Sequence, residues 1–415
     1  MKTQILKALV IVGLVTQIAC ENSKSNGLEA GSKKQVFINS AMSAHDLTEA
    51  GEQLITPTQF MVADKVFDMA LEQDPNNFKA LFYKQFLKSF MVNKGIMTRV
   101  KPLVAKYGNI SEYQKSVKAL PDTPALRFLL DGKEDISKVK DVQAYLSDYQ
   151  SALNDFRKFL IENQDKQLSI EISSAYLENL FKDSEAYECT PVSTTGQNQY
   201  QFECDVTNIT KRKLTTPDFM AIRQSLAGMI FFMNFYTAYS FEGIEILKSL
   251  EIKEGATSEE IMTTVSEKLP EFGKLRSQNL LKETLNLGSD LVSAGRWAVQ
   301  YQNQLCPTGT EVNQQRKGYL FHKGICIKNA DETLRGLAML EQVMSSTIKV
   351  KLGEKNEEFE LDYMAWYKNP VQDLLAIAPK SYNSCGQATA LKDNSLGGLF
   401  VNGDANKLLV TAHCP

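Results

Sequence analysis

Histidine, the side chain most often used for acid–base chemistry and zinc binding, is scarce in this sequence. His45, His322 and His413 are the three present, and no two stand close together. A His-Glu-x-x-His helix, which would place two ring nitrogens on one face, does not occur. We therefore expect structural histidines and predict neither a metal site nor a cofactor.

Two serine motifs have the spacing of a known acylation site. Ser137 and Lys140 fit Ser-x-x-Lys, and Ser381 and Asn383 fit Ser-x-Asn, two elements of penicillin-binding and β-lactamase sites. The third element, Lys-Thr-Gly, does not follow Asn383. That fold also needs a central sheet, whereas the sequence between the two motifs has helical periodicity. We predict that the protein is not an enzyme; a hydrolase with an unfamiliar helical fold is the less favoured alternative.

Cysteine usage indicates an oxidising compartment. The seven cysteines comprise Cys20 and six others, an even number that suits disulfide pairing. The six are Cys189, Cys204, Cys306, Cys326, Cys385 and Cys414. We predict sequential pairing, because each of the first two pairs flanks a polar, turn-like stretch and the last two residues then remain for each other. A metal site is the alternative, but no Cys-x-x-Cys or Cys-x-x-His spacing supports it.

The first 20 residues predict export. Lys2 and Lys7 are basic, and the apolar run that follows is too short to span a bilayer permanently. The stretch Gln17-Ile18-Ala19-Cys20 resembles a bacterial lipoprotein signal, in which the chain is cut before a cysteine that then carries diacylglycerol. The resemblance implies lipid attachment at Cys20. An ordinary secretory signal is the alternative.

A polar stretch follows the cysteine. Residues 20–35 are rich in Ser, Gly, Asn and charge, and we expect a flexible tether. Glu21 stands where Asp would resemble an inner-membrane retention signal. We therefore predict lipid anchoring in the outer membrane, on the periplasmic or the surface side.

Residues 44–77 predict a pair of helices. Small and large apolar residues recur at helical intervals on one face of each, and Pro75 ends the second. The spacing resembles the 34-residue tetratricopeptide repeat at all eight of its signature positions. These are Leu47, Ala50, Gly51, Leu54, Ala63, Phe67, Ala70 and Pro75.

A degraded second repeat follows. A helix opens at Asn77, but Gln85 and Lys88 stand where the family has small and aromatic residues. Helix-pair repeats bind partners on a concave face. We therefore name Tyr83, Phe86 and Phe90 as candidate partner-binding residues, with burial in the core as the competing interpretation.

The middle of the chain is predicted to be helical from residue 100 to 182, interrupted by a disulfide-stapled hairpin at 187–207. Helical periodicity resumes over 217–247, where 18 uncharged residues separate Arg223 from Glu242. Asn234, Thr237 and Ser240 are among five polar residues in that stretch, which favours a central helix over a membrane span. A core role is also predicted for its aromatic stripe at positions 231, 235 and 239.

The last third predicts helices at 258–269, 275–305 and 330–346, followed by a change of period. Over residues 348–363, apolar and charged side chains alternate, which predicts a β-hairpin with Lys facing Glu. Residues 371–378 are predicted to form a short helix, and residues 394–400 a glycine turn. This segment is predicted to form a small α+β cap.

The predicted fold is mainly α: tetratricopeptide-like hairpins that continue into a larger helical domain. The expected segments are a signal peptide at 1–19, a tether at 20–35, a repeat-like segment at 36–110, a helical domain at 111–335 and the cap at 336–415. A balance of 46 basic and 49 acidic residues argues against nucleic acid as a partner. We predict a non-catalytic helical scaffold for a protein or peptide partner in the bacterial envelope. A carrier that holds a glycan or lipid in a cavity lined by the aromatics of 226–241 is the alternative.

Overall fold

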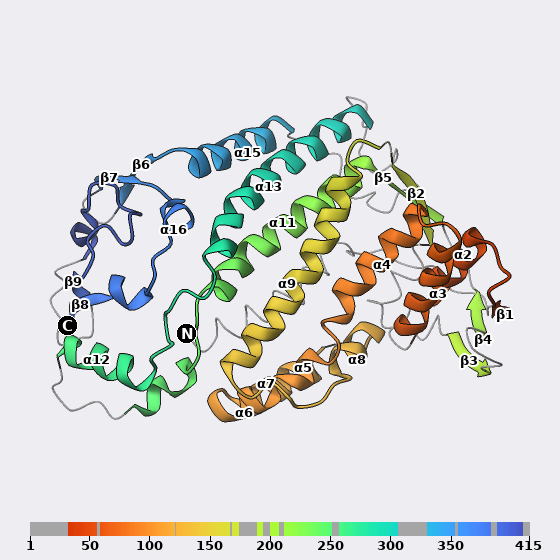
Figure 1. The fold of residues 1–415 in the computed structure, drawn as a ribbon, viewed down its shortest axis with the longest axis horizontal. Helices are drawn as coiled ribbons and strands as arrows, with labels where there is room; N and C mark the ends of the chain where they lie inside the picture. Colours follow the sequence, from red (N-terminus) through yellow and green to blue (C-terminus); the bar gives the residue numbers. More distant parts are fainter. Residues whose placement is uncertain are drawn as a thin grey trace. The chain divides into compact units, whose positions relative to one another are not determined.

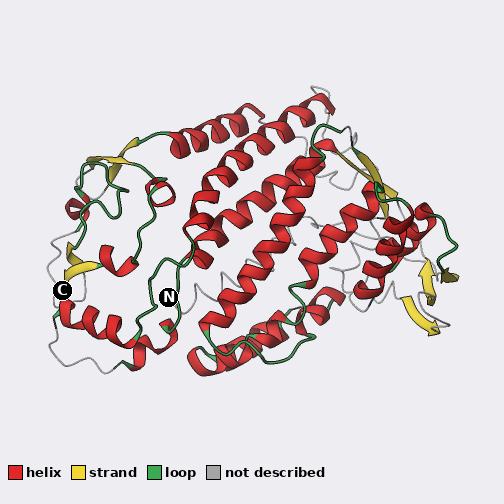
Figure 2. Cartoon of the chain, in the orientation of Figure 1, coloured by secondary structure: helices red, strands yellow, loops and turns green. Residues whose placement is uncertain are grey.

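The computed structural model is mainly helical with small antiparallel sheets, in agreement with the predicted class (Figure 2). The structure describes residues 32–55, 59–120, 122–166, 168–173, 189–193, 200–206, 211–250, 257–305, 330–352, 356–382 and 388–409. The chain divides into two compact units, each discontinuous in sequence, whereas the predicted domains are consecutive segments. Unit 1 comprises Met1–Ser137, Lys158–Phe219 and Gln302–Cys326, and unit 2 comprises Lys138–Arg157, Met220–Tyr301 and Ile327–Pro415.

Unit 1 begins with three helices close to the predicted positions: α2 (Ala44–Gln53), α3 (Phe60–Gln73) and α4 (Phe78–Met91). The Asn77 side chain accepts a hydrogen bond from the backbone N–H of Ala80 and so caps α4. The helical assignments are thus confirmed, while the resemblance to the repeat family stays a prediction.

Close approach of α2 and α3 depends on a glycine. A Cβ added at Gly51 would lie 2.7 Å from the ring of Phe67. That ring stacks on Tyr83 of α4, with ring centroids 5.2 Å apart. A larger residue than glycine at position 51 would therefore push α3 away.

Side chains from distant parts of the chain cover α4. Phe78 stacks on Phe159 of α9 (Val139–Glu162) at 5.1 Å. Both Phe78 and Phe82 also meet Phe219, in the first turn of α11 (Thr216–Ala238), edge to face. The remaining helices of this unit are α5 (Ile96–Arg99), α6 (Lys101–Tyr107), α7 (Ile110–Lys118) and α8 (Pro124–Leu130).

Two sheets in unit 1 differ from the predictions. The expected helical stretch from 100 to 182 is wrong at β2 (Ser169–Ser173), which pairs antiparallel with β5 (Lys211–Thr215), and its last part, 174–182, lies outside the described residues. The predicted hairpin is present as β3 (Cys189–Ser193) and β4 (Tyr200–Val206), but β4 also pairs with β1 (Ser32–Ile38). β1 therefore begins inside the stretch predicted to be a tether.

Four helices of unit 2 run side by side: α9, α11, α13 (Gln278–Leu305) and α15 (Ala330–Ser345) (Figure 1). Glycines within α13 allow this close packing. A Cβ at Gly295 would lie 3.2 Å from Leu337 of α15 and would clash with Gln224 of α11, and one at Gly288 would clash with Met344 of α15. α12 (Ser258–Lys268) begins with a capping box and lies in the same unit.

α11 ends at Ala238, nine residues before the predicted end at 247. The carboxamide of Gln143 on α9 donates to the carbonyls of Tyr236 and Tyr239, at 2.7 and 2.6 Å, and accepts from the N–H of Phe241 at 3.1 Å. This long-range cap replaces the hydrogen bonds of a continuing helix. A 3₁₀ segment, η2 (Ile244–Ser249), follows.

The C-terminal part of unit 2 contains the predicted hairpin, β6 (Ile348–Leu352) and β7 (Glu357–Leu361). Lys349 stands opposite Glu360, as its alternation predicted. The short helix expected at 371–378 is only a 3₁₀ turn, and the glycine turn is confirmed, with Gly397 and Gly398 at φ of +70° and +89°. The other elements are α16 (Ala365–Lys368), η3 (Leu374–Ile377), β8 (Pro379–Tyr382), β9 (Ala388–Leu391) and η4 (Ala405–Leu408).

Candidate functional site

The three candidate partner-binding aromatics lie on α4, in unit 1. Tyr83 is 1% exposed, and Phe86 and Phe90 are half-buried. Phe90 contacts the rings of Phe60 and Phe128, with centroids 5.1 and 5.0 Å apart. Core burial, the competing interpretation, therefore describes Tyr83, which would reach a partner only if α4 were unpacked.

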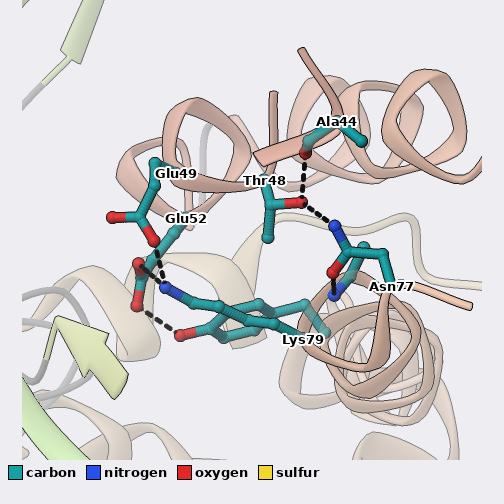
Figure 3. A network of polar contacts seen from close by, with 8 residues as sticks. Ala44, Thr48, Glu49, Glu52, Asn77 and Lys79 are labelled. Carbon is teal, nitrogen blue, oxygen red and sulfur yellow. Dashed lines mark hydrogen bonds and ion pairs between the residues drawn. The ribbon is translucent and has the colours of Figure 1, made fainter. Parts of the chain in front are cut away.

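A polar network holds the buried face of α4 against α2 (Figure 3). The carboxylate of Glu52 accepts from the Tyr83 hydroxyl at 2.5 Å and from the Lys79 ammonium at 2.7 Å. Lys79 also donates to Glu49 at 2.6 Å. A buried carboxylate with this set of donors is satisfied by its neighbours, which gives it a structural role.

A second pair of side chains joins the same two helices (Figure 3). Asn77 donates to the hydroxyl of Thr48 at 3.0 Å, and that hydroxyl donates to the carbonyl of Ala44 at 2.7 Å. Since Asn77 also caps α4, one residue fixes both the start of the helix and its contact with α2. These side chains thus join the start of α4 to α2.

Two of the predicted disulfide cysteines meet in the sheet of unit 1. Cys189 of β3 and Cys204 of β4 are direct register partners. Directly opposed residues of an antiparallel pair have Cα atoms about 4.5–5.5 Å apart, within the range that a disulfide needs. This placement supports the predicted bond, which stays a prediction. The other cysteines named in the predictions lie outside the described residues. They are Cys20, the candidate for lipid attachment, and Cys306, Cys326, Cys385 and Cys414.

The polar residues of α11 that argued against a membrane span cross-link the core of unit 2. The Asn234 amide donates to Thr284 of α13 at 2.8 Å and accepts from Gln150 of α9 at 2.5 Å. Thr237 in turn donates to Gln150 at 2.8 Å. Within the described part of the chain, no helix combines the length and apolar character needed to cross a bilayer.

A buried ion cluster lies among the same three helices and was not anticipated. Asp290 of α13 accepts from Arg157 of α9 at 2.6 Å and from Arg223 of α11 at 2.7 Å, and all three side chains are buried. Arg223 marked only the edge of the uncharged stretch in the sequence. One carboxylate shared by two guanidinium groups ties three helices together.

The aromatic stripe of α11 packs against the C-terminal part of unit 2. Phe231 meets Tyr367 at 5.6 Å, and Phe235 stacks on Trp366 at 6.1 Å. Tyr239 is fully buried and donates its hydroxyl to the carbonyl of Val371 at 2.8 Å. Burial, with a smaller contribution from Tyr367, raises the pKa of Tyr239 to about 12. The predicted core role thus holds for Tyr239, against which the half-buried Phe235 packs, whereas Phe231 is half-buried outside that cluster.

Two other aromatics of α11 point to solvent. Phe232 is 70% exposed and Tyr236 is 54% exposed, and they lie one helical turn apart. The predicted stripe did not include them, and their exposure was not anticipated, because the sequence alone does not show which sides of α11 its neighbours cover. An exposed aromatic pair on a rigid helix is the candidate binding surface in unit 2.

The described residues contain no group of three or more His, Cys, Asp or Glu side chains placed to hold a metal ion. Comparisons with protein-family models, curated proteins and solved structures find no match.

Proposed function

We propose that this protein is a non-catalytic lipoprotein, anchored through Cys20 in the outer membrane of a bacterium, whose helical body is a scaffold for a protein or peptide partner. The lipoprotein-like signal and the polar stretch after it support the anchor. The observation that carries the binding role is the exposure of Phe232 and Tyr236 on α11.

Solvent exposure of these two rings is unfavourable in the isolated protein. Transfer of an aromatic side chain of this size out of water is worth roughly 1.5–3 kcal/mol, so each ring provides a driving force for association. Aromatic residues also dominate the binding energy of protein interfaces. The buried polar contacts of α11 hold both rings in place, which reduces the entropy lost on binding.

The alternative role, an internal carrier of a glycan or lipid, has less support. Such a carrier would need the aromatic stripe to line a cavity. Phe231 and Phe235 instead contact Tyr367 and Trp366. A ligand in that position would have to displace these ring contacts, whereas a partner on Phe232 would displace only water.

Affinity capture tests the proposal. The tagged, lipid-free chain is incubated with detergent-solubilised envelopes, and bound proteins are identified by mass spectrometry. We expect a partner that is retained by the original chain and by the control Met61→Ser, which alters a 68% exposed residue of unit 1. The same partner should be lost with Phe232→Ser. Failure of the original chain to enrich any protein over bare matrix would contradict the proposed function.

A further inference from the structure

The exposed aromatics belong to a longer stripe on α11. Positions 222, 225, 229, 232 and 236 follow one another at intervals of three, four, three and four residues. The residues are Ile222, Ser225, Met229, Phe232 and Tyr236, none of them charged. We call them the α11 seam. Intervals averaging 3.5 residues keep one stripe facing a neighbouring helix along its length, as in a coiled coil.

The seam lies on the side of α11 away from its neighbours. A Cβ at Gly228 would lie 3.4 Å from Leu291 of α13, and Gln224 also faces that helix. Asn234 and Thr237 face α9 through their hydrogen bonds to Gln150. Of the seam residues, Ser225, Phe232 and Tyr236 are exposed, and Ile222 and Met229 are half-buried.

We infer that the partner contributes an amphipathic α-helix that packs along the α11 seam. Phe232 and Tyr236 are its main anchors, and Met229 completes the series i, i+3 and i+7 that is characteristic of helix recognition. The inference rests on the proposed function, because it specifies the partner's structure and the surface that binds it.

The size of the surface favours a single helix over a second copy of this chain. Phe and Tyr side chains have areas of about 150–250 Å² each, so the exposed parts of Phe232 and Tyr236 offer on the order of 250 Å² together. A stable dimer needs about 800 Å² from each partner. Pairing of two copies through this seam alone would therefore fall well short of a stable dimer.

The chemistry of the seam defines the facing side of the partner helix. No charged residue occurs from position 224 to 241. Beyond that stretch, Glu242 lies 3.7 Å from Lys140, so these two charges already compensate each other. The partner helix should therefore present aliphatic or aromatic residues, and its affinity should change less than threefold between about 0.1 and about 0.5 M NaCl.

Site-specific photocrosslinking in cells tests the inference. The photoreactive residue p-benzoylphenylalanine replaces Tyr236 in the full chain, and a second chain carries it at Met61 as a matched exposed control. We expect position 236 to crosslink to one segment of another protein and position 61 not to do so. When the photoreactive residue replaces Phe232 instead, the crosslink should fall in the same segment of the partner, three or four residues from the crosslink made by position 236.

A synthetic peptide of the crosslinked segment then tests the helix. Proline at its centre should weaken binding to the tagged chain about a hundredfold, whereas proline at its first helical position should leave binding unchanged. Equal binding of both peptides would overturn the inference, as would crosslinks to a second copy, a glycan or a lipid. If affinity capture succeeds but position 236 gives no crosslink, the inference fails and the proposed function stands.

Discussion

The substitution Asp290→Asn should destabilise unit 2 more than any surface change. It replaces one acceptor oxygen of a carboxylate shared by Arg157 and Arg223 with an N–H donor and removes the negative charge. Removing one member of a buried ion cluster typically costs about 3–5 kcal/mol. Domains of this kind are stable by roughly 5–15 kcal/mol, so the loss should be readily measurable.

Urea unfolding followed by tryptophan fluorescence is a suitable assay. Both tryptophans, Trp297 and Trp366, lie in unit 2, so the signal reports on this unit. Urea is preferred to guanidinium chloride because it does not screen charges. The midpoint should fall in proportion to the lost free energy, with the slope unchanged.

Two further variants make the result interpretable. Arg157→Met leaves Asp290 bonded to Arg223, so it should cost less, about 1.5–3 kcal/mol. Glu358→Gln breaks an exposed ion pair with Lys349 and should cost at most about 1 kcal/mol. If Asp290→Asn unfolds at the same urea concentration as Glu358→Gln, the interpretation of Asp290 as a buried, shared acceptor is refuted.

Three other outcomes are expected. Gly51→Ala should destabilise unit 1 by up to about 2 kcal/mol through its clash with Phe67, whereas Gly336→Ala, with nothing within 4 Å of the added Cβ, should stabilise α15 by about 0.5–1 kcal/mol; equal signs in thermal unfolding would contradict the packing. Because the pKa of Tyr239 is raised in the folded protein, its contribution is complete below its ordinary value of 10.0 and is lost as the pH rises toward about 12, so Tyr239→Phe should flatten the stability curve in that window. Intact mass should rise by six hydrogens on reduction, for the six cysteines after residue 20; no change would exclude the disulfides.

Helix positions were predictable because their signals are local. Asn77 as a cap, Pro75 just after a helix and the Thr257/Glu260 capping box are all visible within a few residues of the helix ends that they determine. The hairpin of β6 and β7 could be predicted equally well, since its two strands are adjacent in sequence and apolar residues alternate with charged ones along them.

Features that depend on distant partners were missed. β1 pairs with β4, and β2 pairs with β5. Neither β1 nor β2 carries a periodic signal strong enough to be recognised alone. The end of α11 depends on Gln143, which lies more than 90 residues earlier in the chain. In each case the deciding contact is tertiary.

The candidate site was predictable only in part. The uncharged, aromatic-rich helix was identified, and so was the burial of Tyr239. The exposure of Phe232 could not be inferred, because it depends on where α9 and α13 pack. Similarly, Arg157 and Asp290 are 133 residues apart, and no local pattern links them.

Metabolic labelling with a radioactive fatty acid, followed by density separation of inner and outer membranes, tests the anchored scaffold most directly. The native protein should carry the label and sediment with the outer membrane, and Cys20→Ala should do neither. Equal labelling of the two proteins, or recovery of the native protein in the cytosol with reduced thiols, would contradict the account.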